Sequence, residues 1–173
     1  MKRWSLLVVV VAISLLCVIL AVRYGCSKRC YRQTTSPMVP TIKVGDHIWV
    51  DLSAYAKSRP QRWDVVLFHP PAAAKRDSRA SWDMRVVGLP GESITIQDDG
   101  IYIDGKRMAQ PPIVNAIRYQ PPPMEGYQIE GVVFPYAVPA DAYFVVGDNT
   151  TAFDSRFWGA LPSQNILGKV VGK

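Results

Sequence analysis

The longest apolar stretch of the chain lies near its start. Residues 5–22 read SLLVVVVAISLLCVILAV and contain no charged side chain. As an α-helix these 18 residues would be about 27 Å long, close to the thickness of a bilayer core. A cleaved secretory signal has a shorter apolar region that ends in small residues, whereas Arg23 and Tyr24 follow this run. The pattern therefore predicts a retained transmembrane helix.

Beyond residue 32 the pattern changes to short runs of β-branched and aromatic residues, separated by Gly, Pro and Asp. No later stretch keeps the apolar period of about 3.6 residues that is typical of a helix. We therefore predict an all-β domain preceded by one N-terminal helix. The predicted strands are His47–Leu52, Asp64–Phe68, Met84–Gly88, Ser93–Gln97, Ile101–Ile103, Tyr143–Val146 and Ile166–Val171.

Two turns and one proline-rich segment divide this domain. Asp98-Asp99-Gly100 separates two alternating segments and predicts a β-hairpin, and Asp104-Gly105 predicts a second tight turn. Seven prolines between residues 109 and 139 exclude a regular central strand there. We predict an irregular insertion at 109–139, packed on the main sheet or looping from it.

The net charge of +6 is confined to the N-terminal end of the chain. Residues 1–32 contain no acidic side chain and six basic ones, Lys2, Arg3, Arg23, Lys28, Arg29 and Arg32. The remainder has 14 basic and 14 acidic residues and is neutral. Cations that flank an apolar segment indicate attraction to anionic lipid headgroups and not to nucleic acid. Charge counting around the segment slightly favours an amino terminus on the outer side.

The three cysteines do not form a disulfide framework. Cys26 and Cys30 are close enough in sequence to pair, or to be acylated if that stretch is helical, and unpaired thiols are the simplest interpretation. No cluster of His, Cys, Asp and Glu has the spacing of metal ligands. We therefore predict neither a metal nor a cofactor.

Four short segments after the apolar run have distinctive sequences. They are SPMVPTIKVGD at 36–46, RWDVVLF at 62–68, MRVVGLPGE at 84–92, and GDN followed by DSRFWG between 147 and 159. Segments like these occur in the same order in the type I signal peptidases, behind an N-terminal membrane anchor. The chain therefore resembles the type I signal peptidase family, peptidase S26, over roughly residues 34–170.

This resemblance implies the S26 β-fold with one N-terminal transmembrane helix. Residues 1–32 would form the membrane anchor with its basic flanks, and residues 33–173 the β domain, including the insertion at 109–139. The folded domain would lie on the outer face of the cytoplasmic membrane, opposite to the orientation that charge counting favours. The family substrate is the region around an A-x-A-like cleavage site of exported preproteins.

The resemblance also implies where the chemistry occurs. The family uses a Ser directly before the Met of its first motif as nucleophile, and a neutral Lys directly before Arg-Val-Val as base. The corresponding residues here are Pro37 and Met84, and neither can perform these steps. The loop between Asn149 and Asp154 is also one residue shorter than in the family and lacks its supporting Ser.

Other positions match the family pattern more closely. Thr35 corresponds to a Ser whose hydroxyl helps to stabilise the oxyanion, and Met38 and Pro40 belong to the same groove segment. A buried, bidentate bridge between an Asp and an Arg of the last motif is expected to fix the final loop against the sheet. The predicted structural supports are Arg85, Gly147, Asp148, Asn149, Asp154, Ser155 and Arg156.

The first functional hypothesis is a non-catalytic homologue that binds signal peptides and acts as a chaperone or assembly partner. A groove that pairs with an extended peptide through main-chain hydrogen bonds does not need the catalytic pair. Its candidate partners are exported preproteins or their signal peptides, membrane lipid, an active signal peptidase and surface-assembly machinery. Nucleic acid is not among them.

The alternative is an active serine endopeptidase that uses Ser36, shifted by one position, with a non-standard base. Lys75, His69 and His47 are the candidate bases, because Arg85 stays protonated. A purely structural membrane protein without peptide binding is the third hypothesis. Loss of either member of the catalytic pair is expected to remove most activity, since nucleophile and base act as a unit.

Overall fold

The computed structural model describes residues 9, 11–15, 27–74, 80–114, 117–119 and 131–173. Residues 9 and 11–15 are helical. The predicted anchor at residues 5–22 lies mostly outside the described residues. Among those that are described, no helix combines the length and the apolar character needed to cross a bilayer.

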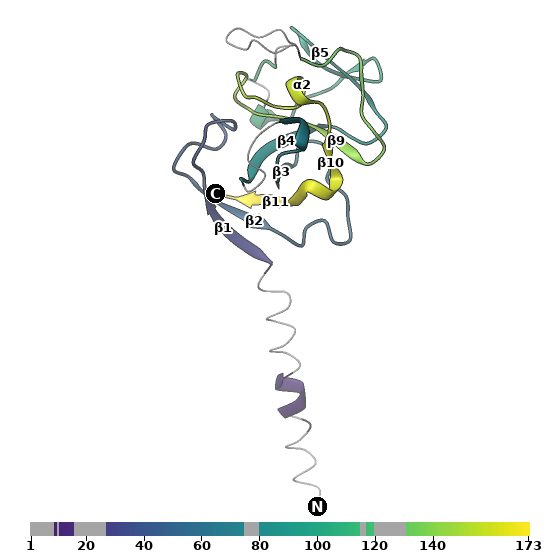
Figure 1. Cartoon of the computed structure of the whole chain (residues 1–173). Helices are drawn as coiled ribbons and strands as arrows, with labels where there is room; N and C mark the ends of the chain where they lie inside the picture. The colour runs from purple at the N-terminus through teal and green to yellow at the C-terminus, as the bar shows by residue number, and fades with distance from the viewer. Residues whose placement is uncertain (1–8, 10, 16–26, 75–79, 115–116, 120–130) are drawn as a thin grey trace, which may run out of the picture.

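Most of the described strands form one antiparallel sheet of seven strands, in the order β1-β2-β11-β3-β4-β9-β10 (Figure 1). β-Bulges interrupt the pairing of β11 with β2 and β3, and of β4 with β9. Such bulges bend a strand and increase its local twist. In sheet order, the strands are β1 (Lys28–Arg32), β2 (His47–Asp51), β11 (Ile166–Gly172), β3 (Val65–Phe68), β4 (Trp82–Gly88), β9 (Ala142–Val146) and β10 (Leu161–Pro162).

A smaller antiparallel sheet covers part of the larger one and has the order β7-β6-β5-β8. Its strands are β7 (Lys106–Arg107), β6 (Gly100–Ile103), β5 (Ser93–Gln97) and β8 (Tyr136–Ala137). Short helical turns occupy some of the connections, namely η1 (Ala72–Ala74), η2 (Pro112–Val114), α2 (Ser155–Trp158) and η3 (Ser163–Asn165).

Both predicted turns of the small sheet are confirmed. Asp98-Asp99 joins β5 to β6, and Asp104-Gly105 joins β6 to β7. Asp104 and Gly105 have φ angles of 50° and 76°. Asp and Gly accept this left-handed conformation more readily than most residues, which is why the pair predicts a hairpin turn.

The all-β prediction is confirmed for the described domain, and each of the seven predicted strands overlaps an observed strand. β1 differs from expectation, because Lys28–Arg32 belongs to the predicted basic flank of the anchor. It pairs with β2 along its whole length, so the sheet begins before residue 33. Four of its five side chains are exposed, so no apolar alternation marks it in the sequence. Cys30 is an exposed free thiol on this strand, and Cys26 lies outside the described residues.

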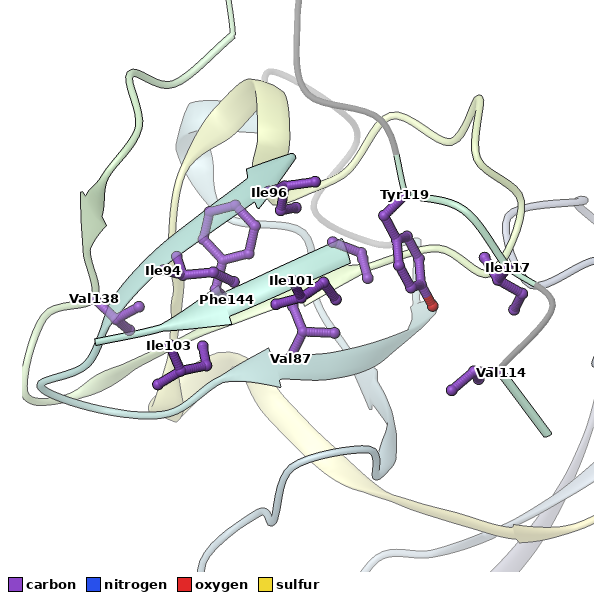
Figure 2. Close-up of a cluster of buried hydrophobic side chains, with 11 residues drawn as sticks. Val87, Ile94, Ile96, Ile101, Ile103, Val114, Ile117, Tyr119, Val138 and Phe144 are labelled. Carbon is purple, nitrogen blue, oxygen red and sulfur yellow. The ribbon is translucent and has the colours of Figure 1, made fainter. Parts of the chain in front are cut away.

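Figure 2 shows the hydrophobic cluster between the small sheet and β9. Ile94 and Ile96 of β5 and Ile101 and Ile103 of β6 alternate with more accessible residues and pack with Phe144 of β9. Full burial of each such side chain contributes about 1.5–3 kcal/mol. The two sheets are therefore joined by a continuous apolar layer.

The proline-rich segment 109–139 contributes to this same cluster. Its residues Val114, Ile117, Tyr119 and Val138 are buried there. Its only described strand, β8, lies at the edge of the small sheet, where proline-flanked strands are tolerated. The described part of the segment therefore packs on the domain, and residues 115–116 and 120–130 lie outside the description.

Candidate functional site

An open groove of about 700 Å³ lies where the segment after β1, the first half of β4 and the loop after β9 meet. This volume is within the usual range of ligand-binding sites, about 300–1,000 Å³. Three of the four distinctive sequence segments therefore converge on one site. We call it the Met84 groove, and it is lined by Thr35, Ser36, Pro37, Ala80, Trp82, Met84, Asn149, Thr151, Ala152 and Phe153.

Met84 forms the floor of the groove. β4 pairs with β3 in a register that places Met84 opposite Val66. Because side chains alternate along a strand, Trp82, Met84 and Val86 point to one face, where they pack in the cluster that contains Phe68. Met84 is only 2% exposed. Its thioether cannot accept a proton at neutral pH, so the floor of the groove provides no base.

Residues 35–37 form one wall, and the loop after β9 fixes their backbone. The main-chain N–H of Asn149 donates to the Pro37 carbonyl oxygen at 2.9 Å. The Asn149 side chain donates through Nδ2 to the Ser36 carbonyl oxygen at 3.1 Å. A Cβ on Gly147 would lie 2.5 Å from the Pro37 carbonyl oxygen, so only glycine leaves room for this approach.

The Asn149 amide is itself held in place. Its Oδ1 accepts hydrogen bonds from the main-chain N–H and the hydroxyl of Thr151, at 3.1 and 2.9 Å. These bonds orient Nδ2 toward the opposite wall. Pro37 on that wall has neither a hydroxyl nor a backbone N–H. It therefore supplies neither a nucleophile nor a main-chain donor for an oxyanion.

The Met84 groove has hydroxyl groups but no general base among its described lining residues. Thr35 and Ser36 are both exposed on the wall. None of the described lining residues is Lys, Arg, His, Cys, Asp or Glu. The exposed His69 is not a lining residue, although its Nδ1 lies 3.3 Å from the carbonyl oxygen of Ala80, which does line the groove. Lys75 falls outside the described residues.

A buried ion pair joins β4 to the loop after β9. Arg85 donates through Nε and Nη2 to the two carboxylate oxygens of Asp148, at 2.8 and 2.6 Å, and through Nη1 to the Trp63 carbonyl oxygen at 2.9 Å. Burial opposes the charge of Arg85, but its hydrogen bonds with Asp148 prevail and raise its pKa. Arg85 therefore stays a cation and cannot act as a base.

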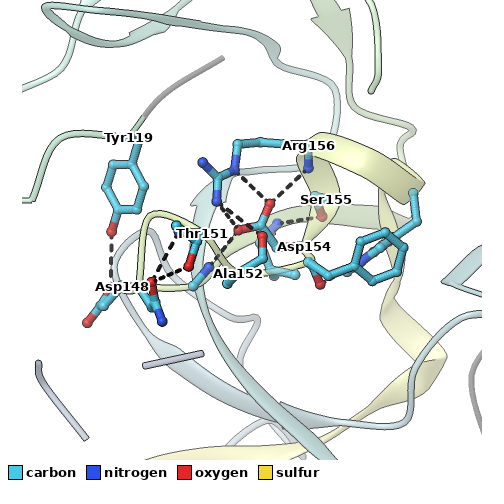
Figure 3. Close-up of polar contacts among 12 residues, drawn as sticks. Tyr119, Asp148, Thr151, Ala152, Asp154, Ser155 and Arg156 are labelled. Carbon is cyan, nitrogen blue, oxygen red and sulfur yellow. Dashed lines mark hydrogen bonds and ion pairs between the residues drawn. The ribbon is translucent and has the colours of Figure 1, made fainter. Parts of the chain in front are cut away.

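Tyr119 completes this network. Its hydroxyl donates to Asp148 Oδ1 at 3.1 Å (Figure 3). Burial raises the pKa of Tyr119 strongly, and the negative charge of Asp148 adds to the effect. The hydroxyl therefore stays protonated and remains a donor.

Asp154 organises the turn that follows the groove (Figure 3). Its carboxylate accepts hydrogen bonds from Arg156 Nε at 2.8 Å and Nη2 at 2.7 Å, and both side chains are fully buried. It also accepts from the main-chain N–H of Gly147 at 3.0 Å. The Ser155 hydroxyl accepts from the main-chain N–H of Val145 at 3.0 Å. The expected bridge between Asp154 and Arg156 is therefore present, and the hydrogen bonds from the main-chain N–H groups of Gly147 and Val145 tie this turn to the end of β9.

The family model for signal peptidase, peptidase S26, matches residues 1–172 of the chain. The chain belongs to the peptidase S26 family. It is 35% identical to signal peptidase I of Leptolyngbya laminosa over 138 residues, which are 78% of this chain and 62% of that protein. It is 32% identical to signal peptidase I V of Bacillus subtilis strain 168 over 143 residues, which are 81% of this chain and 82% of that protein.

A solved S26 structure agrees with this assignment. A signal peptidase I from Enterococcus faecalis V583 matches with a TM-score of 0.50 and 26% identity, over 66% of this chain and 98% of that chain. The family membership indicated by the four motifs is therefore confirmed. The chain spans 62% of the length of the Leptolyngbya relative.

Two residues that were expected in the S26 groove lie elsewhere. Met38 is fully buried in the cluster beneath β2 and β3, because its side chain points away from the wall that Pro37 forms. Pro40 is exposed and lines a separate apolar depression with Val170 and Lys173. Of the first S26 motif, Ser36 and Pro37 alone line the groove, together with Thr35 directly before it.

Sequence reasoning did not identify several residues that shape the S26 site. Ala80, Ala152 and Phe153 line the groove, and no pattern in their sequence indicates this. Gln33 and Asp83 are buried beside the groove and hydrogen-bonded to each other at 2.9 Å. Asp83 did carry a signal, since it is a lone acidic residue next to the apolar run of β4.

Proposed function

We propose that this S26 protein binds the cleavage region of exported preproteins without hydrolysing it. The observation that carries the proposal is that an assembled groove has Pro37 and Met84 where the family resemblance expects the nucleophile and the base. The supports of the site, including the Arg85–Asp148 and Asp154–Arg156 pairs, are intact. Selection for binding alone would preserve these supports and tolerate loss of the catalytic pair.

Acyl transfer needs a nucleophile whose proton is taken up by a positioned base. Pro37 has no side-chain nucleophile, and the Met84 thioether cannot take up a proton. In peptidases the two groups act as a unit, so losing both leaves little beyond the catalysis that binding and electrostatics supply.

Peptide binding has an independent structural basis in β4. β3 pairs with β4 from Trp82 to Arg85, whereas the described β9 pairs begin at Arg85 and run toward Gly88. The stretch before Arg85 thus has β3 on one side and lies next to the groove on the other. An extended peptide can add to this strand edge, which no described strand covers, through main-chain hydrogen bonds, with its side chains entering the groove alternately.

A hydrolytic role for Ser36 is the competing proposal. Ser36 is exposed on the groove wall, and its carbonyl group is held by Asn149. What this role lacks is a base, because no described lining residue titrates in the neutral range. We therefore favour binding and treat hydrolysis by Ser36 as an outcome of the test.

The cellular setting is part of the same proposal. The uncharged run at residues 5–22 would anchor the chain in the cytoplasmic membrane, with the folded domain on the outer face. There it would meet preproteins as they are exported. An active signal peptidase or surface-assembly machinery would then act on the bound preprotein.

The test is incubation of the purified full chain in detergent with a preprotein that has an A-x-A cleavage site. We expect binding without cleavage by the parent, and cleavage by the double variant Pro37→Ser with Met84→Lys. The single variants Pro37→Ser and Met84→Lys serve as matched controls. Each is expected to remain inactive, because nucleophile and base act as a unit.

Two results would contradict the proposal. Cleavage by the parent that disappears in Ser36→Ala would establish Ser36 as a shifted nucleophile. Failure of the parent to bind any preprotein, measured by fluorescence anisotropy with a labelled signal peptide, would remove the binding role.

A further inference from the structure

Asp83 is a buried carboxyl group one residue before the floor of the Met84 groove. It lies on β4 and is only 3% exposed. Its Oδ1 accepts a hydrogen bond from Gln33 Nε2 at 2.9 Å. Among the described residues, no donor reaches its buried Oδ2. An ionised carboxylate with an unpaired oxygen is costly in a buried site, and a protonated carboxyl is much less so.

The charges that face Asp83 do not favour its ionisation. Arg85 follows two residues later on the same face of β4, but its guanidinium is committed to Asp148 and to the Trp63 carbonyl group. Asp148, beyond the end of β9, adds a negative charge, and the Tyr119 hydroxyl donates to Asp148. Burial raises the pKa of Asp83 and Asp148 adds to this, while the hydrogen bond from Gln33 opposes it.

Gln33 connects this carboxyl to the wall of the groove. It directly follows β1, is 6% exposed, and lies two residues before Thr35. Its backbone is bonded to the turn before β2, through the carbonyl group of Asp46 and the N–H of Gly45, both at 2.8 Å. The wall at residues 35–37 is thus held from one end by Gln33 and from the other by the loop after β9.

We propose that Asp83 is a positioning residue whose buried carboxyl group, in its protonated form, fixes the 35–37 wall through Gln33. Ionisation of Asp83 would strengthen its bond with Gln33 but leave a buried, charged Oδ2 without a partner. Water that enters to solvate this oxygen would loosen this end of the wall. Peptide affinity would then fall as the pH rises. This inference rests on the proposed binding function and makes the peptide affinity of the same groove depend on pH.

The direction of the pH effect follows from linkage. The folded-state pKa of Asp83 lies above the ordinary value of 3.8 for an aspartate, because the carboxyl group is buried. The stability that neutral Asp83 contributes is fully present below the ordinary value, and it is lost as the pH rises through the raised one. The same protonation would hold the wall in its binding position.

The first experiment measures the Kd of a labelled signal peptide with an A-x-A cleavage region, using the full chain in detergent from about pH 4, near the ordinary value of Asp, to about pH 9. We expect the parent to lose affinity several-fold over this range. Asp83→Asn, which stays neutral and keeps an acceptor for Gln33, is expected to bind tightly with a flat profile. Asp98→Asn, at an exposed hairpin turn, is the matched control and is expected to follow the parent. Equal pH profiles for the parent and Asp83→Asn would overturn the inference while leaving the binding function intact.

A second experiment reports on the carboxyl without peptide. The thermal unfolding temperature of Asp83→Asn minus that of the parent is expected to increase as the pH rises. A difference that does not change with pH would mean that Asp83 is not held neutral, and it would overturn the inference.

Gln33→Leu is expected to weaken peptide binding at every pH, and unchanged binding would equally overturn the positioning role. If no variant binds peptide, the proposed function fails and the positioning role fails with it.

Discussion

Gly147 is the residue at which the loop after β9 comes nearest to the wall of the groove. A Cβ at this position would lie 2.5 Å from both the Pro37 carbonyl oxygen and the Ala152 Cβ. The first of these atoms belongs to the backbone, so the contact cannot be relieved by a side-chain rotation. The position of Pro37 in the groove thus depends on the absence of a side chain at Gly147.

We expect Gly147→Ala to destabilise the domain by about 1–3 kcal/mol and to weaken peptide binding, because the wall must move away from the loop. Urea unfolding and peptide anisotropy would measure the two effects. Gly172→Ala is the matched control, since nothing lies within 4 Å of its added Cβ. Equal stability of the two variants would show that the wall adjusts without cost.

β4 is the element that links the core to the groove. One of its faces places Met84 and Trp82 at the groove, and the other places Asp83 and Arg85 in a buried polar layer. The bidentate pair between Arg85 and Asp148 connects this layer to the loop that fixes the 35–37 wall. The Arg85–Asp148 pair therefore holds together two elements that are distant in sequence.

We expect Asp148→Asn to cost about 3–5 kcal/mol of unfolding free energy, because it leaves the buried Arg85 cation without its countercharge. Asp99→Asn is the matched control, since Asp99 and Arg107 form an ion pair at 3.6 Å with both side chains exposed. Removing an exposed pair is expected to cost less than about 1 kcal/mol. Similar losses in the two variants, measured by urea unfolding, would contradict the importance of burial here.

At the scale of the whole molecule, the β domain begins with β1. This strand pairs with β2 from Lys28 to Arg32, and Tyr31 packs against the cluster of Ile48 and Val50. It also leads directly into Gln33 and the wall of the groove. The segment that joins the predicted anchor to the domain is therefore part of the sheet.

We expect a fragment of residues 27–173 to fold, and a fragment of residues 33–173 to be less stable, because loss of β1 exposes the edge of β2. The Tm of the 33–173 fragment, measured by circular dichroism, should be lower than that of the 27–173 fragment by about 5 °C or more. The shorter fragment should also aggregate more readily. Equal Tm values would show that β1 adds nothing to the domain.

Much of the fold was predictable, because most of its strands carry local apolar patterns between Gly, Pro and Asp. The edge strand β1 and the two-residue strands were not, because they have no alternation of buried and exposed residues. Within the site, residues 35–37 and Met84 were predicted and do line the groove, and Asn149, predicted as a structural support, lines it as well. Met38 was not placed correctly, because the direction of its side chain depends on how the turn after Pro37 packs on the core.

The sequence by itself determined the family, the positions of the main strands along the chain, and the presence of Pro37 and Met84 where the family resemblance expects the nucleophile and the base. Each of these depends on the identity of residues that are near one another along the chain. Only the tertiary structure decided which residues form the groove and that Asp83 is buried against Gln33, 50 residues away. Such contacts depend on strand register and loop closure, which bring distant segments together and which no local pattern specifies.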